Sequence, residues 1–252
     1  MKLKPRSKRE LELMRQSGQI SAKVLKKVLE SIKVGVSALE LDKLAAAEIE
    51  RLGGEQSYKT VPGYKCATCI TFNDQVVHGV PTTRKVKKGD LISVDLAVFY
   101  KGWHTDTAWT ILVDEKNKEK EEFLRVGKEA LKAGIKQAVA GKRVGDIGAA
   151  IQEMVEGAEY HVVRALVGHG VGKQLHEEPE IPGYGNKGTG PLLEEGMTLA
   201  IEVIYSAGTS DVILDSDGWT YKSADESMAG LFEMTVIVGK KEGKVLTDWR
   251  KV

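Results

Sequence analysis

The amino-terminal part of the chain carries apolar residues at the spacing of an α-helix. Gly35 ends this helical pattern, because glycine is favoured just beyond helix ends. Ser37 and Glu40 then form a capping box that predicts a second helix, which Gly53 and Gly54 end. The apolar stripe of the first helix consists of Leu11, Met14, Ile20, Val24, Leu25, Val28 and Ile32.

A second helix pair is predicted over residues 119–157, and it repeats the pattern of the first. Gly35 aligns with Gly141, which follows it by 106 positions. The same shift aligns Leu25 with Leu131, Leu29 with Ile135 and Leu41 with Ile147. After each helix pair come strand-like segments and a histidine beside a glycine, at His78 and at His169. We therefore predict an α+β domain of two similar halves, with chance similarity between amphipathic helices as the alternative.

The segment LISVDLAVFYKGWHTDTAWTILV reads as two strands around the short turn Lys101-Gly102. With a two-residue turn, Asp95 lies opposite Ala108 in the neighbouring strand. Side chains alternate along a strand, so Asp95 and Asp106 then lie on one face as diagonal neighbours. Two aspartates on one face can share a metal site. The alternative is a pair of ordinary hairpin aspartates on a solvated face.

Three further residues of metal-binding type, His169, Glu202 and Glu233, stand in largely apolar contexts. Carboxylates seldom point into apolar sheets unless a cation holds them there. Four carboxylates around one divalent ion leave about two uncompensated charges, whereas two ions balance all four. We therefore predict a dinuclear site in which two ions lower the pKa of a shared water. Oxygen and imidazole donors suit Mn²⁺, Fe²⁺, Co²⁺ or Zn²⁺.

Composition favours a single enzyme domain over residues 1–252, because 42% hydrophobic and 29% charged residues suffice for one large core. The net charge of +1 provides no excess of positive charge that would indicate binding to nucleic acid or to an anionic membrane. The amino terminus MKLKPRSKRE is charged and lacks the apolar core of a signal peptide. No apolar stretch is long enough to span a membrane. We therefore expect a cytoplasmic protein.

Cys66 and Cys69 form one CxxC pair without a second pair, so a structural zinc site would lack half of its ligands. A redox motif is the alternative, but the βαβ setting expected for one is missing. We expect reduced, non-catalytic cysteines.

The chain resembles the methionine aminopeptidases, specifically the short bacterial type I form, from about Glu10 to Val238. The stretches that carry the resemblance are NDQVVHGVP, ISVDLAVFYKGWHTDTA, GHGVGKQLHEEPEIPGYG, GMTLAIE and GLFEMT. The resemblance implies the "pita-bread" fold, in which a pseudo-twofold sheet carries two helix pairs outside and two metal ions between its halves. It also implies that the metal ligands are Asp95, Asp106, His169, Glu202 and Glu233, with Asp106 and Glu233 as the bridging pair.

By the same resemblance, His78 and His176 contact the substrate. His176 would stabilise the charge that grows on the scissile carbonyl, and Glu202 would relay a proton to the leaving amine. The methionine side-chain pocket would be lined by Tyr64, Cys69 and Trp219, since a thiol and aromatic rings suit a thioether. His104 and His161, which lie in no motif, are expected to be structural.

Four residues depart from the family pattern. Met234 stands where the family usually has a histidine, and we expect this change to remove a hydrogen-bond donor near Glu233 and to weaken metal binding. Val203 stands where proline is common, and Leu175 and Val61 replace aromatic residues of the pocket.

The resemblance implies removal of the initiator methionine from nascent polypeptides before a small second residue. About thirty residues separate Glu202 from Glu233, too few for the helical insertion of type II enzymes. One alternative is an Xaa-Pro aminopeptidase of the same fold, although such relatives usually have an added amino-terminal domain. Another is a catalytically weak or silent relative that binds a ribosome or protein. The expected partners are nascent amino-terminal peptides and possible ribosomal contacts, with a monomeric chain.

Overall fold

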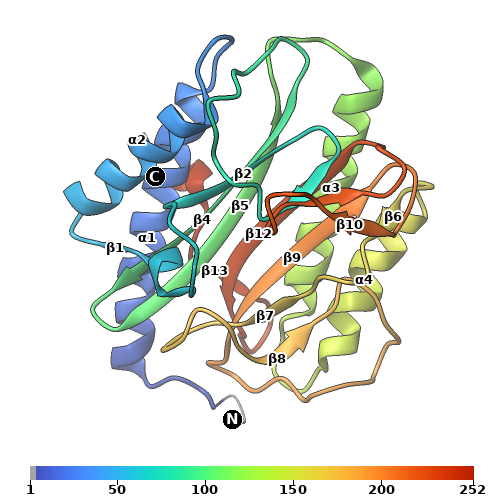
Figure 1. The fold of residues 1–252 in the computed structure, drawn as a ribbon. Coiled ribbons are helices and arrows are strands. Elements are labelled where there is room, and N and C mark those ends of the chain that lie inside the picture. Colours follow the sequence, from blue (N-terminus) through green and yellow to red (C-terminus); the bar gives the residue numbers. More distant parts are fainter. Residues whose placement is uncertain (1–3) are drawn as a thin grey trace.

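Two helix pairs and a large antiparallel sheet form the computed structural model, which describes residues 4–252 (Figure 1). The start of the charged amino-terminal segment, residues 1–3, lies outside the described residues. The first half contains α1 (Lys8–Ser31), α2 (Ala38–Arg51), β1 (Glu55–Gln56), the 3-10 helix η1 (Ser57–Thr60), β2 (Thr68–Phe72), β3 (Gln75–Val77), β4 (Leu91–Tyr100) and β5 (Trp103–Leu112).

The second half begins with another helix pair and continues with the remaining strands. Its elements are α3 (Lys118–Gln137), α4 (Val144–Glu156), β6 (His161–Val162), β7 (Gly168–Gly170), β8 (Glu177–Ile181), β9 (Thr198–Ser206), β10 (Val212–Leu214), β11 (Tyr221–Ser223), β12 (Ala229–Ile237), β13 (Lys244–Val245) and the 3-10 helix η2 (Trp249–Lys251). Within the described residues, no helix is both long and apolar enough to cross a membrane.

The main sheet has the strand order β1-β4-β5-β12-β9-β7-β8, with β2 on β4, β6 on β9 and β13 on β12. A smaller sheet has the order β10-β11-β3. The two halves of the chain meet where β5 pairs with β12, a contact between segments more than a hundred residues apart. The central strands therefore come from both halves, and any residues on their common face are brought together there.

The helices cover one face of the main sheet. α1 packs on β4 and β5, and α3 packs on β9 and β12, so the two helix pairs take equivalent places on the two halves. This arrangement favours the interpretation as two similar halves over chance similarity. Strand alternation sends one set of side chains into the core beneath the helices and the other set to the opposite face. The first set includes Val94, Leu96, Ile201, Val203, Phe232 and Met234.

The predicted start of the second helix agrees with the structure, whereas the first helix ends at Ser31, four residues before Gly35. Ser37 and Glu40 form the predicted capping box at the start of α2. Gly35 and Gly141, the glycines aligned by the repeat, both adopt left-handed backbone with φ of 94° and 90°, which an L-residue rarely adopts.

The hairpin register of β4 and β5 is also as predicted. Tyr100 pairs with Trp103 across the Lys101-Gly102 turn, and Asp95 pairs with Ala108. Both turn residues have positive φ, 48° and 86°, as a type I′ turn requires.

Candidate metal centre

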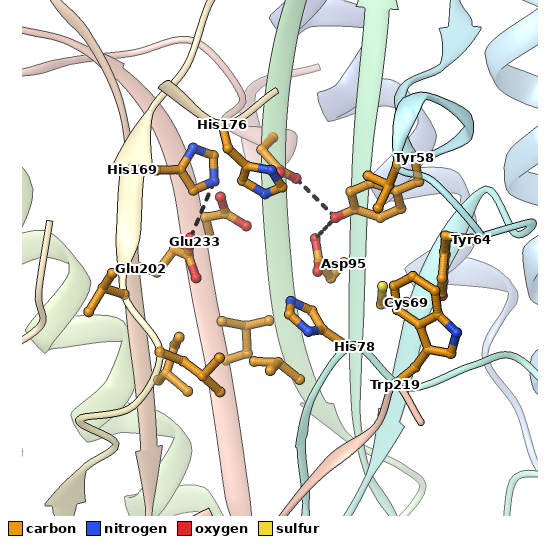
Figure 2. A pocket seen from close by; sticks show the side chains of 17 residues that line it. Tyr58, Tyr64, Cys69, His78, Asp95, His169, His176, Glu202, Trp219 and Glu233 are labelled. Atoms are coloured by element: carbon orange, nitrogen blue, oxygen red, sulfur yellow. Dashed lines mark hydrogen bonds and ion pairs between the residues drawn. The ribbon is translucent and has the colours of Figure 1, made fainter. Parts of the chain in front are cut away.

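The five predicted ligands come from five strands of the main sheet and line one pocket (Figure 2). They are Asp95 on β4, Asp106 on β5, His169 on β7, Glu202 on β9 and Glu233 on β12. They lie on the face of the sheet opposite the helices, because their strand neighbours pack into the helix-covered core. The interpretation of Asp95 and Asp106 as ordinary aspartates on a solvated face is wrong, since both are buried.

Strand pairing brings these side chains within ligand distance of one another. Asp106, His169 and Glu233 each offer one ligand atom, and the three atoms lie within 4.8 Å of one another. Glu202 pairs directly with Glu233 across β9 and β12. The Glu202 Oε1 atom also lies 3.5 Å from His169 Nε2. Asp95 lies beside this group and is linked to Asp106 through a shared hydrogen-bond donor, Tyr58.

The four carboxylates are in an environment that disfavours their charged forms. Burial, followed by repulsion from Asp106, raises the pKa of Asp95, Glu202 and Glu233 well above the usual values. Burial also raises the pKa of Asp106, to about 6. Among the described residues, no lysine or arginine forms an ion pair with any of the four. Such a cluster calls for a cation that is not a side chain.

His169 is prepared to act as a neutral ligand. Burial, with a smaller contribution from His176, lowers the pKa of His169 to about 3, so its imidazole is uncharged near neutral pH. Its Nδ1 lies 2.9 Å from the carbonyl oxygen of Gly170, which can only accept a hydrogen bond. Nδ1 therefore carries the hydrogen, and the lone pair of Nε2 is free for a metal.

The donor set fits divalent cations. Glu233 Oε1 is buried and has no hydrogen-bond partner among the described residues, an arrangement that is costly for a carboxylate oxygen unless a cation binds it. Two divalent ions would balance the four carboxylates, and the oxygen and nitrogen donors suit the metals named above.

The pocket extends from these ligands to an apolar end. Its volume is about 220 Å³. Tyr64, Cys69 and Trp219 gather at one end of it, away from His169 and Glu202 (Figure 2). The rings of Tyr64 and Trp219 meet edge-to-face with centroids 5.0 Å apart. The three residues expected to line a side-chain pocket therefore share one wall next to the ligands.

The two histidines expected to contact substrate line the same pocket. His176 packs against His169, with ring centroids 4.5 Å apart. His78 has a left-handed backbone with φ of 58°, a conformation that costs a non-glycine residue free energy and is often found at functional sites. Burial lowers the pKa of both side chains, so each imidazole is neutral near neutral pH and carries one N–H donor.

The sequence analysis missed Tyr58, which lies on η1 and lines the pocket. Its hydroxyl donates to Asp95 Oδ1 at 2.5 Å and approaches Asp106 Oδ1 at 3.2 Å. Burial and the nearby carboxylates raise its pKa well above 10, which keeps the hydroxyl protonated and able to donate. Tyr58 belongs to no motif in the sequence, so no local signal indicated it.

The expectation that residue 234 lies near the Glu233 carboxylate is wrong. Met234 follows Glu233 on β12, so its side chain points to the opposite face of the sheet. It is buried in the core beneath the helices and cannot contact the carboxylate. Val203 is likewise buried in that core, on the far side from Glu202. Leu175 and Val61, by contrast, do pack with Tyr64 and Cys69, and Val61 lines the pocket.

The remaining cysteines and histidines take no ligand position in the described structure. Cys66 and Cys69 are not joined in a disulfide, and Cys69 is a pocket residue. His104 is buried and its Nδ1 lies 2.6 Å from Ser57 Oγ, a structural contact as expected. His161 is exposed on β6 and does not line the pocket.

Fold and ligand set together define a metal-dependent peptidase, and the chain belongs to metallopeptidase family M24, whose sequence model matches residues 12–240. It is 39% identical to methionine aminopeptidase 1 of Bacillus subtilis over 95% of this chain and 96% of the relative.

Two solved structures of methionine aminopeptidases are closely similar. That from Thermotoga maritima has a TM-score of 0.95 and 39% identity, covering 97% of this chain and 99% of the other. That from Rickettsia prowazekii also has a TM-score of 0.95, with 32% identity and coverage of 97% and 99%. The resemblance stated from the sequence and the pita-bread fold are thereby confirmed, and the protein is a metal-dependent hydrolase.

Proposed function

We propose that the protein removes the initiator methionine from nascent polypeptides, preferentially where the second residue is small. The observation that carries this proposal is the position of the apolar pocket end beside the ligand cluster. A pocket closed by Tyr64, Cys69 and Trp219 suits one amino-terminal side chain, and its thiol and rings suit a thioether. The methionine aminopeptidases that resemble this chain along their whole length support the same activity.

We infer that two divalent ions act at the site, drawn from Fe²⁺, Mn²⁺, Co²⁺ and Zn²⁺. Asp106 and Glu233 would help to hold both ions, because their strands, β5 and β12, lie between the strand of Asp95 and those of Glu202 and His169. When bound, the ions would lower the pKa of a water molecule so that it attacks the peptide bond, and would hold the substrate's α-amine.

The chain's own residues would orient the substrate and move the proton. Glu202 would accept the proton from the attacking water and pass it to the leaving amine. His176 would donate a hydrogen bond to the scissile carbonyl oxygen as negative charge develops there. His78 would contact the peptide backbone beyond the cleaved bond. Their neutral imidazoles at the pocket wall support these roles, because a neutral histidine keeps one N–H donor.

We further propose that the substrates are the amino-terminal peptides of nascent chains, met in the cytoplasm by a monomer at or near the ribosome. The net charge of +1 supports no direct nucleic-acid site.

The test is a cleavage assay with each of the four metals on peptides that begin Met-Ala, Met-Leu and Ala-Pro. We expect rapid release of methionine from Met-Ala, slow release from Met-Leu and no cleavage of Ala-Pro. Asp106→Asn serves as the inactive control. Preferential cleavage of Ala-Pro would favour the Xaa-Pro alternative. No cleavage with any metal, together with tight binding to ribosomes, would favour the silent binding module.

A further inference from the structure

We propose that Tyr58 is a positioning residue that contacts both the side-chain pocket and the metal ligands. Its hydroxyl orients Asp95, and its ring forms part of the pocket wall. The inference rests on the proposed function for its link to methionine, but its link to metal binding can be measured without any substrate.

The contact with Asp95 is short and lies between two buried side chains. The Tyr58 hydroxyl lies 2.5 Å from Asp95 Oδ1, and the Tyr58 side chain is buried. Within the part of the chain that the structure describes, Tyr58 provides the hydrogen bond from a protein donor to the Asp95 carboxylate. Asp106 differs, because its Oδ1 also accepts from the backbone N–H of Thr107 at 2.9 Å. Loss of the Tyr58 hydroxyl therefore affects Asp95 more than Asp106.

A hydrogen bond to one oxygen fixes the rotation of a carboxylate. With Oδ1 held by Tyr58, the position of the other oxygen of Asp95, Oδ2, is fixed as well. Partners of this kind orient metal ligands, and their loss typically lowers metal affinity or activity about 10–100-fold.

Tyr58 itself is held by contacts that do not involve the carboxylates. It lies on η1, whose first residue, Ser57, is bonded through Oγ to His104 Nδ1 at 2.6 Å. The hydroxyl of Thr60 closes the same turn by donating to the Ser57 carbonyl oxygen at 2.7 Å. The phenol therefore reaches Asp95 from a turn anchored on β5, and the position of that turn is set by contacts independent of the carboxylates.

The ring of Tyr58 has a second role at the pocket. It meets Tyr64 edge-to-face, with centroids 5.9 Å apart and planes at 88°, and Tyr64 in turn packs on Trp219. Figure 2 shows Tyr58, Tyr64 and Trp219 on the side of the pocket that also holds Asp95. A side chain that enters the pocket thus touches an aromatic wall whose first member is bonded to a metal ligand.

Tyr58→Phe separates the two roles, because it keeps the ring and removes the hydroxyl. We expect calorimetric titration of the metal-free variant with Mn²⁺ to show one site weakened about 10–100-fold. We also expect the visible absorption spectrum of the Co²⁺-loaded variant to change, since that spectrum reports the ligand geometry. With saturating metal, KM for a Met-Ala peptide should stay within about twofold of the wild type, because the pocket wall is intact.

Tyr205→Phe is the matched control. Tyr205 is a buried tyrosine whose hydroxyl donates to the Phe123 carbonyl oxygen at 2.6 Å, on the helix side of the sheet. Its loss should leave Mn²⁺ affinity and the Co²⁺ spectrum unchanged. In an Asp95→Asn background, Tyr58→Phe should have no further effect on metal affinity if it acts through Asp95.

Wild-type Mn²⁺ affinity and an unchanged Co²⁺ spectrum in Tyr58→Phe would overturn the inference, as would a full additional loss in the Asp95→Asn background. These outcomes do not depend on the substrate. If the wild type cleaves no methionine peptide, the proposed function fails while the metal titrations still decide the role of Tyr58.

Discussion

Neighbouring residues of one strand face different environments in this molecule. Glu233 lines the pocket among the proposed ligands, whereas Met234 lies in the core beneath the helices. The assignment of GLFEMTVIV to a strand is sufficient to predict this difference, because adjacent side chains of a strand point to opposite faces. The comparison of residue identities suggested instead a contact between adjacent side chains, which a strand does not allow. For a residue next to a ligand on a strand, the alternation of side chains predicts which face it occupies better than its identity does.

Met234→His should therefore destabilise the protein without improving metal binding. The new imidazole would be buried among apolar side chains, and we expect the free energy of unfolding to fall by about 1–3 kcal/mol. Mn²⁺ affinity by calorimetry should match the wild type. Met234→Leu is the control, with an expected loss below about 1.5 kcal/mol in urea unfolding. An increase in Mn²⁺ affinity for Met234→His would contradict this placement.

Tyr58 marks the limit of prediction at this scale. The ligands could be proposed because carboxylates in apolar strands are unusual, whatever their neighbours. A buried tyrosine is common, and its meaning depends on which side chains lie opposite. Here those are Asp95 and Asp106, more than thirty positions away. Only the folded arrangement of η1 against β4 and β5 reveals the contact.

At the scale of elements, local geometry predicted the β4–β5 hairpin well, because a two-residue turn and strand alternation fix its register. The alternation of side chains along a strand is not sufficient to predict the structure of the segment GHGVG. Its register with β8 shifts between His169 and Gly170, so the strand bends there. A side chain added at Gly170 would have its Cβ 2.3 Å from the Glu178 carbonyl oxygen. Glycine at this position lets β7 and β8 approach while His169 and His176 both reach the pocket.

Gly170→Ala should accordingly reduce both stability and metal binding. The added methyl group must push β7 away from β8, at an expected cost of about 1–3 kcal/mol in unfolding free energy. Because His169 is the preceding residue, we also expect weaker binding of Mn²⁺ in a calorimetric titration.

Gly102→Ala is the control for this experiment. Nothing lies within 4 Å of the added Cβ, but φ of 86° imposes about 1–2 kcal/mol of strain at the hairpin tip. This variant should lose stability and keep its Mn²⁺ affinity. Equal Mn²⁺ affinities for Gly170→Ala and the wild type would show that the bend at Gly170 is not needed to place His169.

For the whole molecule, the two helix pairs and the α+β class were predictable from periodicity, but the order of the strands was not. The pairing of β5 with β12 joins residues separated by about 125 positions, as between Glu233 and Ala108, and no local pattern encodes it. That pairing brings the carboxylates of both halves to one place. The concentration of negative charge at the site is therefore a property of the assembled sheet. The same carboxylates that would bind the metal ions destabilise the fold when no metal is bound.

Glu233→Gln should separate stability from metal binding. Glu233 Oε1 has no hydrogen-bond partner among the described residues, and burial, followed by repulsion from the other carboxylates, disfavours the charged form of Glu233. Because the variant has no carboxylate at this position, we expect the metal-free variant to melt at a higher temperature than the metal-free wild type. A gain of about 1 kcal/mol corresponds to a shift of roughly 2–4 °C for a protein of this size. Added Mn²⁺ should then stabilise the wild type by about 2.7 kcal/mol at a hundred times Kd, and the variant much less. Glu195→Gln, at an exposed carboxylate, should change neither melting temperature. A metal-free variant that melts below the wild type yet responds fully to Mn²⁺ would show that repulsion at Glu233 is not what the cations relieve.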